Sequence, residues 1–179
     1  MTNGTNNKYK PVFMQRAIEL SEIAYKSGKG LPIGCVIVKN GVIIGEGHNE
    51  IFSRNNPTSH GEIVAIENAC KETKNLQLDD CEMYTTLEPC PMCLGAIYWA
   101  KLKTVYFANT SKNASEAGFD DAFIFKEINL EPEKRKIPML NTGNAEALKI
   151  LQEWKLHNLP DSQPWAEEVK PTLNKKADY

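Results

Sequence analysis

Two short motifs constrain this chain more than any other feature: His60-Gly61-Glu62 and Pro89-Cys90-Pro91-Met92-Cys93. One His and two Cys can supply the three protein ligands of a catalytic zinc ion, which leaves the fourth tetrahedral position for a water molecule. Zinc lowers the pKa of such a water to about 7. Because each motif lies where a helix is expected to begin, the fold has to bring two helix starts together around one ion.

The spacing within each motif suits these roles. Pro91 favours the first helical turn, so Cys90 and Cys93 lie one turn apart at a helix N-terminus, where the helix dipole and the metal both stabilise a thiolate. Glu62 follows His60 by two residues and can stand beside the metal without binding it. The combined pattern, H-x-E and P-C-x-x-C, is the signature of zinc deaminases, in which the Glu is a general acid/base.

Each part of this pattern also has a simpler interpretation. His60 alone is consistent with an ordinary core or surface histidine. Ser59-x-x-Glu62 before an apolar run also matches a capping box, in which Glu62 accepts a backbone N–H. Cys90 and Cys93 alone are compatible with a redox pair or with half of a structural zinc site. The conjunction of both motifs at helix starts, with a strand before the cysteines, favours the catalytic zinc site.

Composition excludes several classes of protein. The 179 residues suffice for one ordinary domain with its own core, and the formal net charge of −2 argues against a large nucleic-acid surface. No apolar run reaches the length of a membrane span, and residues 1–10 lack the apolar core of a signal peptide. Apart from the two motif cysteines, an odd number remains, which we interpret as core residues of a protein in a reducing compartment: Cys35, Cys70 and Cys81. We therefore expect a cytoplasmic protein.

The periodicity of apolar residues predicts alternating helices and strands. Pro11 begins a helix with an apolar stripe, and Asn40-Gly41 is typical of a β-hairpin turn. The later order of strand, helix, strand, helix, strand implies parallel crossovers with helices on both faces. We predict an α/β fold, a three-layer α/β/α sandwich around a mixed, mostly parallel sheet of about five strands, with the metal at one edge. The predicted elements are a helix from residue 11, strands at 35–38, 42–45, 81–87, 104–108 and 137–140, and helices at 60–73, 90–100 and 145–154.

A longer run around the second motif, from Thr86 to Ile97, is shared widely by tRNA adenosine deaminases and fungal cytosine deaminases. It therefore identifies a superfamily and leaves the substrate open. The similarity to one group, the bacterial guanine deaminases of the cytidine deaminase-like fold, extends from about Pro11 to Glu127 and returns at the last residues. The stretches that most resemble this group are Ile97-Tyr98-Trp99-Ala100, Glu116-Ala117-Gly118-Phe119-Asp120-Asp121, and Asn174-Lys175-Lys176 with Tyr179.

Two positions depart from the bacterial guanine deaminases, which usually have Pro-Phe-Gly before the first strand and His-Ala-Glu in the first motif. This chain has Pro32-Ile33-Gly34 and His60-Gly61-Glu62, and both variants resemble fungal cytosine deaminase. Ile33 in place of an aromatic residue removes a flat stacking surface for a purine, a contact worth about 0.5–1.5 kcal/mol. Cytosine, isocytosine and other amino-heterocycles therefore stay open as substrates.

The resemblance implies one zinc ion per chain, held by the His and the two Cys of the motifs, and hydrolysis of a free nucleobase. The expected reaction converts guanine into xanthine and ammonia, a step of purine metabolism, and Glu62 transfers the protons. The backbone N–H of Gly61 and the side-chain amide of Asn49 would hold the base, although Asn49 alone is equally consistent with a turn at a strand end. Further substrate contacts are implied for Ile33, Trp99, Asp121 and Tyr179.

The resemblance also implies a homodimer. Residues 1–10 are expected to be disordered, and residues 11–155 to form the deaminase domain. Residues 156–179 are expected to form a tail that crosses to the partner subunit and closes its active site through Tyr179. The alternative is a solvated tail, with Asp121 as an ordinary loop residue.

Two other functions compete with that of a base deaminase. A tRNA adenosine deaminase is expected to have a cationic face for the RNA backbone, which a net charge of −2 does not indicate. A purely structural zinc site normally has four protein ligands, so it needs one more from His48, His157, Cys35, Cys70 or Cys81. We expect a small nucleobase as the substrate, and neither a membrane nor a nucleic acid as a partner.

Overall fold

The computed structural model describes residues 9–158 of the chain. The chain divides into two compact units, one that ends at Lys126 and one that begins at Glu127. The first unit contains both zinc motifs and all the strands of the described residues. The disordered segment (1–10), the deaminase domain (11–155) and the tail (156–179) stay predictions.

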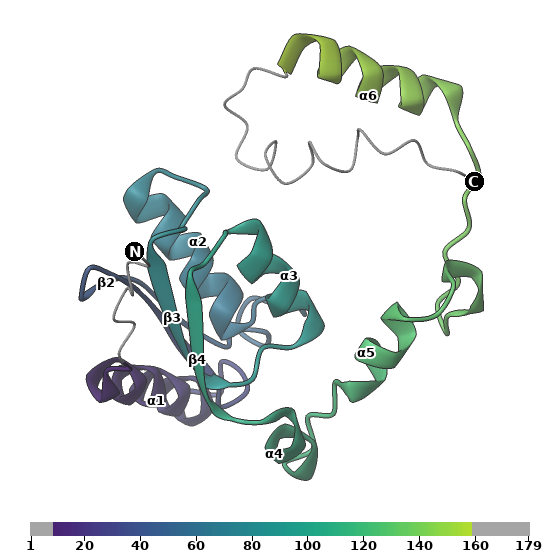
Figure 1. The fold of residues 1–179 in the computed structure, drawn as a ribbon. Helices are drawn as coiled ribbons and strands as arrows, with labels where there is room; N and C mark the ends of the chain where they lie inside the picture. Colours follow the sequence, from purple (N-terminus) through teal and green to yellow (C-terminus); the bar gives the residue numbers. More distant parts are fainter. Residues whose placement is uncertain (1–8, 159–179) are drawn as a thin grey trace, which may run out of the picture. The chain divides into compact units, whose positions relative to one another are not determined.

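A mixed sheet forms the centre of the first unit (Figure 1). β1 is antiparallel to both of its neighbours, whereas β3 and β4 are parallel to each other. Three of the four strands therefore run in the same direction and the predicted mixed sheet is confirmed, with one parallel and two antiparallel strand pairings. In spatial order the strands are β2 (Val42–His48), β1 (Gly34–Lys39), β3 (Cys81–Leu87) and β4 (Thr104–Asn109).

The described sheet has four strands instead of the predicted five or so. Residues 137–140, predicted as a last strand, form no strand. They belong to the second unit, where Ile137, Met139 and Leu140 are exposed. A strand needs a neighbour that pairs with its backbone N–H and C=O groups, and the described part of the second unit contains no other strand.

Helices cover both faces of the sheet (Figure 1). α1 (Pro11–Lys26) packs on one face, whereas α2 (Gly61–Thr73) and α3 (Pro91–Trp99) pack on the other. Each face buries its own cluster of apolar side chains. The predicted three-layer α/β/α sandwich is therefore confirmed.

Strand β1 contributes to both clusters, because successive side chains of a strand point to opposite faces. Cys35 and Ile37 pack in the cluster under α2 and α3, and Val36 and Val38 pack in the cluster under α1. None of the four is more than 2% exposed. The central strand is thus an apolar run, as expected for a strand covered on both faces.

The direction of the strands brings the two motifs together. β2 and β3 run in the same direction, α2 follows β2, and α3 follows β3. His60 immediately precedes α2, and Cys90 immediately precedes α3. Both helix starts therefore lie at the same edge of the sheet, where the sequence predicts the metal.

The β1–β2 hairpin turns at Asn40-Gly41, as predicted. Both residues have positive φ angles, 51° for Asn40 and 82° for Gly41. A two-residue turn of this kind matches the twist of the strands that it joins, and asparagine and glycine are the residues that adopt it most readily.

Gly47 of β2 lets α2 approach the sheet closely. A Cβ atom on Gly47 would lie 2.2 Å from the carbonyl oxygen of Gly61 and 2.4 Å from the backbone nitrogen of Ala65. Both atoms belong to the backbone of α2, so no side-chain rotation can relieve the overlap. The close approach fixes the first turn of α2, which contains Glu62, against the end of β2.

Shorter helical segments follow the sheet. α4 (Ser111–Glu116) begins at a capping box formed by Thr110 and Asn113. The later elements are α5 (Ala122–Ile128), the 3-10 helix η1 (Pro132–Lys134) and α6 (Ala145–Asn158). Within residues 9–158, no helix has the length and apolar character that a membrane crossing requires.

We predict that Gly47→Ala lowers the free energy of unfolding by about 1–3 kcal/mol or more, because the new methyl group overlaps the backbone of α2. Gly61→Ala is the matched control, because its Cβ would come no closer than 3.1 Å to a neighbouring atom. We expect this control to change stability by less than about 1 kcal/mol. Urea denaturation of the two variants measures the difference, and equal stabilities would contradict the close packing of α2 on β2.

Candidate active site

His60, Cys90 and Cys93 form a cluster of metal-binding side chains. Nδ1 of His60 lies 3.6 Å from Sγ of Cys90 and 3.6 Å from Sγ of Cys93, and the three ligand atoms lie within 4.8 Å of one another. His60 is the N-cap residue of α2 and Cys90 that of α3, but neither side chain caps its helix. Both side chains are therefore available to a ligand.

The cluster suits a tetrahedral zinc ion. Bonds of about 2.3 Å to sulfur and about 2.0 Å to nitrogen separate nitrogen and sulfur ligands by about 3.5 Å at a tetrahedral centre. The observed separations of 3.6 Å agree with this value. Cys93 is buried, whereas His60 and Cys90 are only half-buried, so one side of the cluster stays accessible. Three protein ligands with an accessible side are typical of catalytic zinc.

Cys90 carries the more acidic of the two thiols. Hydrogen bonding to Cys93 lowers the pKa of Cys90 to about 4, and hydrogen bonding to His60 adds to this effect, although burial opposes it. The same bond between the cysteines raises the pKa of Cys93. The N-terminus of α3 further favours a thiolate at Cys90. Zinc binding would convert both cysteines into thiolates and release the remaining proton.

Glu62 is a buried carboxylate in the first turn of α2. The residue is 3% exposed, and its Oε1 accepts a hydrogen bond of 3.4 Å from Oγ1 of Thr85. Within the described part of the chain, Oε2 has no hydrogen-bond partner. Burial raises the pKa of Glu62. The capping-box interpretation is wrong, because it needs Ser59 as the N-cap residue, whereas the N-cap residue of α2 is His60 and Glu62 follows it by two positions instead of three.

A cavity of about 330 Å³ opens beside the cluster. Its volume is within the usual range of small-molecule sites. The cluster contributes His60 and Cys90 to the lining, and Glu62 lines the same cavity. Asp121 also lines it, and burial raises the pKa of Asp121. The other lining residues are Leu31, Ile33, Leu87, Glu88, Gly118, Phe119 and Asp120.

Asn49 follows β2 and is completely buried. Its Oδ1 accepts hydrogen bonds from the backbone N–H groups of Leu31, at 3.1 Å, and Ile51, at 3.3 Å. Its Nδ2 has no partner among the described residues. A Cβ atom on Gly30 would lie 2.2 Å from Oδ1, so this arrangement requires a glycine there. The oxygen of Asn49 thus closes a turn. Neither Asn49 nor Gly61 is among the residues that line the cavity.

The remaining predicted site residues lie in different places. Ile33 lines the cavity with Asp121. Gly61 is buried at the first position of α2. Trp99, at the end of α3, is 71% exposed and does not line the cavity. Tyr179 lies outside the described residues.

Several cavity residues have no predicted role. Glu88 directly precedes Pro89 of the second motif, so its place beside the metal ligands was recognisable from the sequence. Its Oε2 accepts a hydrogen bond of 2.7 Å from the backbone N–H of Ser111, which connects the end of β3 to the start of α4. Phe119 and Asp120 come from the loop after α4, and the signal for them was Asp121, a residue of the same loop for which the resemblance implies a substrate contact.

No fourth protein ligand joins the cluster within residues 9–155. The ring of His48 contacts the carbonyl oxygen of Asn49 instead, with Nδ1 at 3.2 Å. His157 lies outside the described side chains. The remaining cysteines pack in or beside the core under α2 and α3: Cys35, Cys70 and Cys81. The described residues therefore give no support to a four-ligand structural site.

Residues 8–109 match a family model described as the cytidine and deoxycytidylate deaminase zinc-binding region. The chain belongs to this family. The matched residues include His60, Cys90 and Cys93, so the cluster is part of the zinc-binding region of a deaminase. This family match confirms the predicted zinc cofactor and the prediction of a hydrolase.

Individual relatives resemble this deaminase over most of its length. Guanine deaminase from Bacillus subtilis (strain 168) is 50% identical over 143 residues, which cover 80% of this chain and 92% of the relative. The X-ray structure of guanine deaminase from Bacillus subtilis matches with a TM-score of 0.81 and 46% identity, over 87% of this chain and 98% of that one. The tRNA-specific adenosine deaminase of Aquifex aeolicus is 37% identical over 103 residues, which cover 58% of this chain and 68% of the relative.

We predict that the purified deaminase carries about one zinc ion per chain, because three side chains and one further ligand complete a single tetrahedral site. Cys93→Ala should lose most of the metal. Cys70→Ala is the matched control and should retain it, because Cys70 lies outside the cluster. Elemental analysis of both variants measures the zinc content. Full zinc retention by Cys93→Ala would contradict the assignment of the ligands.

Proposed function

We propose that this deaminase hydrolyses guanine to xanthine and ammonia. The observation that carries the proposal is a buried Glu62 with one carboxylate oxygen that has no hydrogen-bond partner among the described residues, in the same cavity as a three-ligand cluster for zinc. This pairing supplies the two components of hydrolytic deamination, a metal site and a proton carrier. Among the possible bases we favour guanine, because guanine deaminase from Bacillus subtilis matches this chain over 92% of its own length.

His60, Cys90 and Cys93 would hold the zinc ion, which supplies a water molecule acidified to a pKa of about 7. Glu62 would take a proton from the attacking water and deliver it to a ring nitrogen of the base. The same carboxyl group would then move the proton of the newly added hydroxyl group to the amino group, which leaves as ammonia. Burial raises the pKa of Glu62, so the carboxyl group can retain a proton between the two transfers more readily than an exposed glutamate.

Asn49 and Gly61 would hold the base in position. Asn49 donates its backbone N–H to the cavity residue Ile33, and Gly61 lies between two cavity residues in the sequence. Because the oxygen of Asn49 is already bonded to two backbone N–H groups, the side chain offers donors and no free acceptor. The backbone N–H of Gly61, in the first turn of α2, is a second donor at the same edge of the sheet. Two donors suit a substrate that presents acceptors, such as the carbonyl oxygen and ring nitrogens of guanine. Ile33 and Asp121 would contact the base from the cavity wall.

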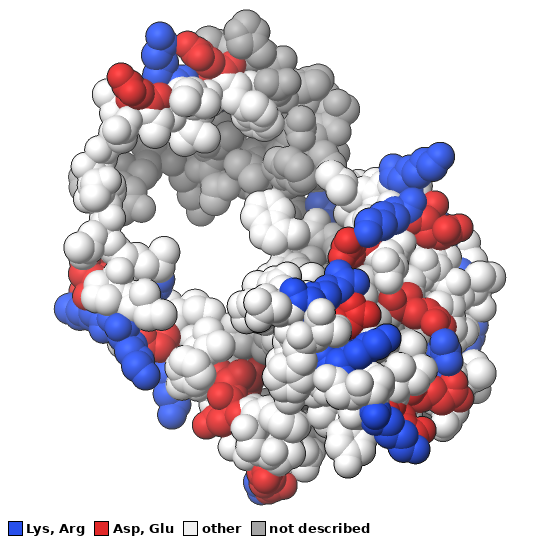
Figure 2. Space-filling view, turned by 180° about the vertical axis from the view of Figure 1, so that it is seen from behind, with Lys and Arg blue, Asp and Glu red and all other residues white. Residues whose placement is uncertain are grey.

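The charge of the cavity favours an uncharged base over a nucleotide or RNA. Its lining includes Glu62, Glu88, Asp120 and Asp121, and neither lysine nor arginine. A phosphate group would meet negative charge there without a cation to pair with. On the face of the first unit in Figure 2, lysines and arginines alternate with acidic residues and form no cationic surface for an RNA backbone.

We predict ammonia release from guanine at a kcat/KM at least about tenfold above that from cytosine, isocytosine, adenine or guanosine. A coupled ammonia assay across these compounds measures the preference. Cys93→Ala is the control for release that does not depend on the zinc site. Faster release from cytosine than from guanine would contradict the proposed substrate and would favour the pyrimidine alternative, whereas activity on a tRNA anticodon stem-loop alone would exclude a free base.

The dimer is part of the same proposal. Large aromatic side chains of α3 and of β4, which is at the edge of the described sheet, are exposed: Tyr98 by 75%, Trp99 by 71% and Phe107 by 45%. In α6, Leu148, Leu151 and Trp154 recur every third residue and are also exposed. Apolar surfaces of this kind usually mark protein interfaces. We infer that a second copy of the chain covers them, with the predicted tail crossing between subunits and Tyr179 closing the partner's cavity.

We predict that deletion of residues 175–179 lowers kcat by about 10–100-fold, because a lid excludes water and completes the contacts of the substrate. The melting temperature should change little. Deletion of residues 2–6 is the matched control and should leave kcat unchanged. Steady-state kinetics and light scattering test both parts of the proposal, and unchanged kinetics or a monomeric wild type would contradict it.

A further inference from the structure

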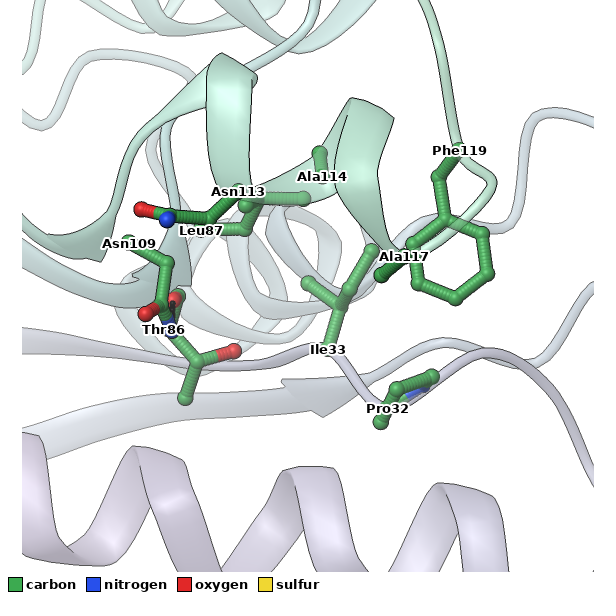
Figure 3. A pocket seen from close by; sticks show the side chains of 9 residues that line it. All are labelled: Pro32, Ile33, Thr86, Leu87, Asn109, Asn113, Ala114, Ala117 and Phe119. Carbon is green, nitrogen blue, oxygen red and sulfur yellow. Dashed lines mark hydrogen bonds between the residues drawn. The ribbon is translucent and has the colours of Figure 1, made fainter.

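A second cavity lies beside the candidate active site. Figure 3 shows the side chains that line it. Its volume is about 250 Å³. α4 and the residue that follows it form one wall, with Asn113, Ala114 and Ala117. The ends of β3 and β4 and the segment before β1 provide Thr86, Asn109 and Pro32. The last three lining residues are Ile33, Leu87 and Phe119.

The two cavities share a wall. Ile33, Leu87 and Phe119 line both the second cavity and the cavity beside the zinc cluster. All three side chains are apolar. The wall therefore separates the space for the reacting base from a second space large enough for a substituent of that base.

Two parts of this wall belong to the framework of the sheet. The carbonyl oxygen of Ile33 accepts a hydrogen bond of 2.8 Å from the backbone N–H of Asn49. Leu87 is the last residue of β3 and pairs with Asn109 of β4. Changes at Ile33 or Leu87 would therefore disturb the sheet as well as the wall.

Phe119, unlike the other two residues of the wall, does not belong to the framework of the sheet. It belongs to the loop between α4 and α5 and follows Gly118, whose φ angle of 92° directs the chain away from α4. Its backbone N–H donates a hydrogen bond of 2.8 Å to the carbonyl oxygen of Ala114. In Figure 3 its ring lies beside Ala117, on the side of Ile33 and Pro32. A substitution at Phe119 would therefore change the ring without disturbing the pairing of the strands.

We propose that Phe119 is a specificity-determining residue, whose ring closes the active-site cavity toward the second cavity and restricts the substrate to an unsubstituted base. This inference rests on the proposed deamination of guanine. With the ring present, a substituent that points toward α4 has no space. Without it, the two cavities join, and the substituent would enter a space whose other lining residues are Pro32, Ala114 and Ala117 together with the polar Thr86, Asn109 and Asn113. A volume of about 250 Å³ has room for a small alkyl group against the proline and alanine side chains.

The test compares guanine with guanines that carry an ethyl group at N7 or at N9. In Phe119→Ala, the kcat/KM for at least one of the ethylguanines, divided by that for guanine, should rise about tenfold or more, as expected when an apolar pocket gains room for one or two carbon atoms. Phe119→Leu removes less of the ring and should give a smaller rise. Release of ammonia and spectroscopic detection of the xanthine product measure both rates.

A second substitution refills the new space. Ala117 lines only the second cavity and is exposed, so Ala117→Leu alone should leave the activity on guanine unchanged. In the double variant, Phe119→Ala with Ala117→Leu, the added side chain should reverse most of the gain on the ethylguanine. If Phe119→Ala only loosened the active site in general, the increased kcat/KM for the ethylguanine would persist in the double variant.

The outcomes separate this inference from the proposed function. If Phe119→Ala keeps its zinc, its melting temperature and its activity on guanine but gains none on either ethylguanine, Phe119 does not determine specificity. A gain that Ala117→Leu fails to reverse also overturns the inference. If the wild-type enzyme releases no ammonia from guanine, the proposed function fails first. Should Phe119→Ala not fold, the same comparison in Phe119→Leu decides.

Discussion

The active site depends on one constraint, the common direction of β2 and β3. Because both strands end at the same edge of the sheet, the helices that follow them begin there, and each contributes ligands from its N-terminus. His60 comes from one helix start and the two cysteines come from the other. The dipole of α3 favours the thiolate form of the cysteines at its N-terminus. The close contact of α2 with Gly47 then holds Glu62 at a fixed position beside the cluster.

The proposed chemistry depends on buried polar atoms that have no hydrogen-bond partner among the described residues. One oxygen of Glu62 and the amide nitrogen of Asn49 are buried without hydrogen bonds among the described residues, at a cost that a bound substrate or water would remove. The cluster itself has three protein ligands and an accessible side. The cavity lining carries carboxylates and neither lysine nor arginine, which disfavours phosphates, and Phe119 is the residue that we propose to limit the size of the substrate. Together these features fit the proposed hydrolysis of a small, uncharged base.

The sequence predicts the local parts of this site better than the parts that meet through the fold. The motifs fix the zinc ligands, because the required residues are close together at two helix starts. The strand predicted at 137–140 is absent, because an apolar run forms a strand only beside a partner. Phe119 reaches the cavity only because α4 and Gly118 direct its loop there. The exposed position of Trp99 likewise depends on which face of α3 the sheet covers.

The central claim is that Glu62 transfers protons in the reaction and does not merely stabilise α2. The most direct measurement is the kcat of Glu62→Gln with guanine, together with its zinc content and melting temperature. We expect kcat to fall about 10²–10⁴-fold, while zinc and stability are retained. Glu67→Gln, an exposed position of the same helix, should keep the wild-type rate. A Glu62→Gln enzyme within a few-fold of the wild-type kcat would contradict the account.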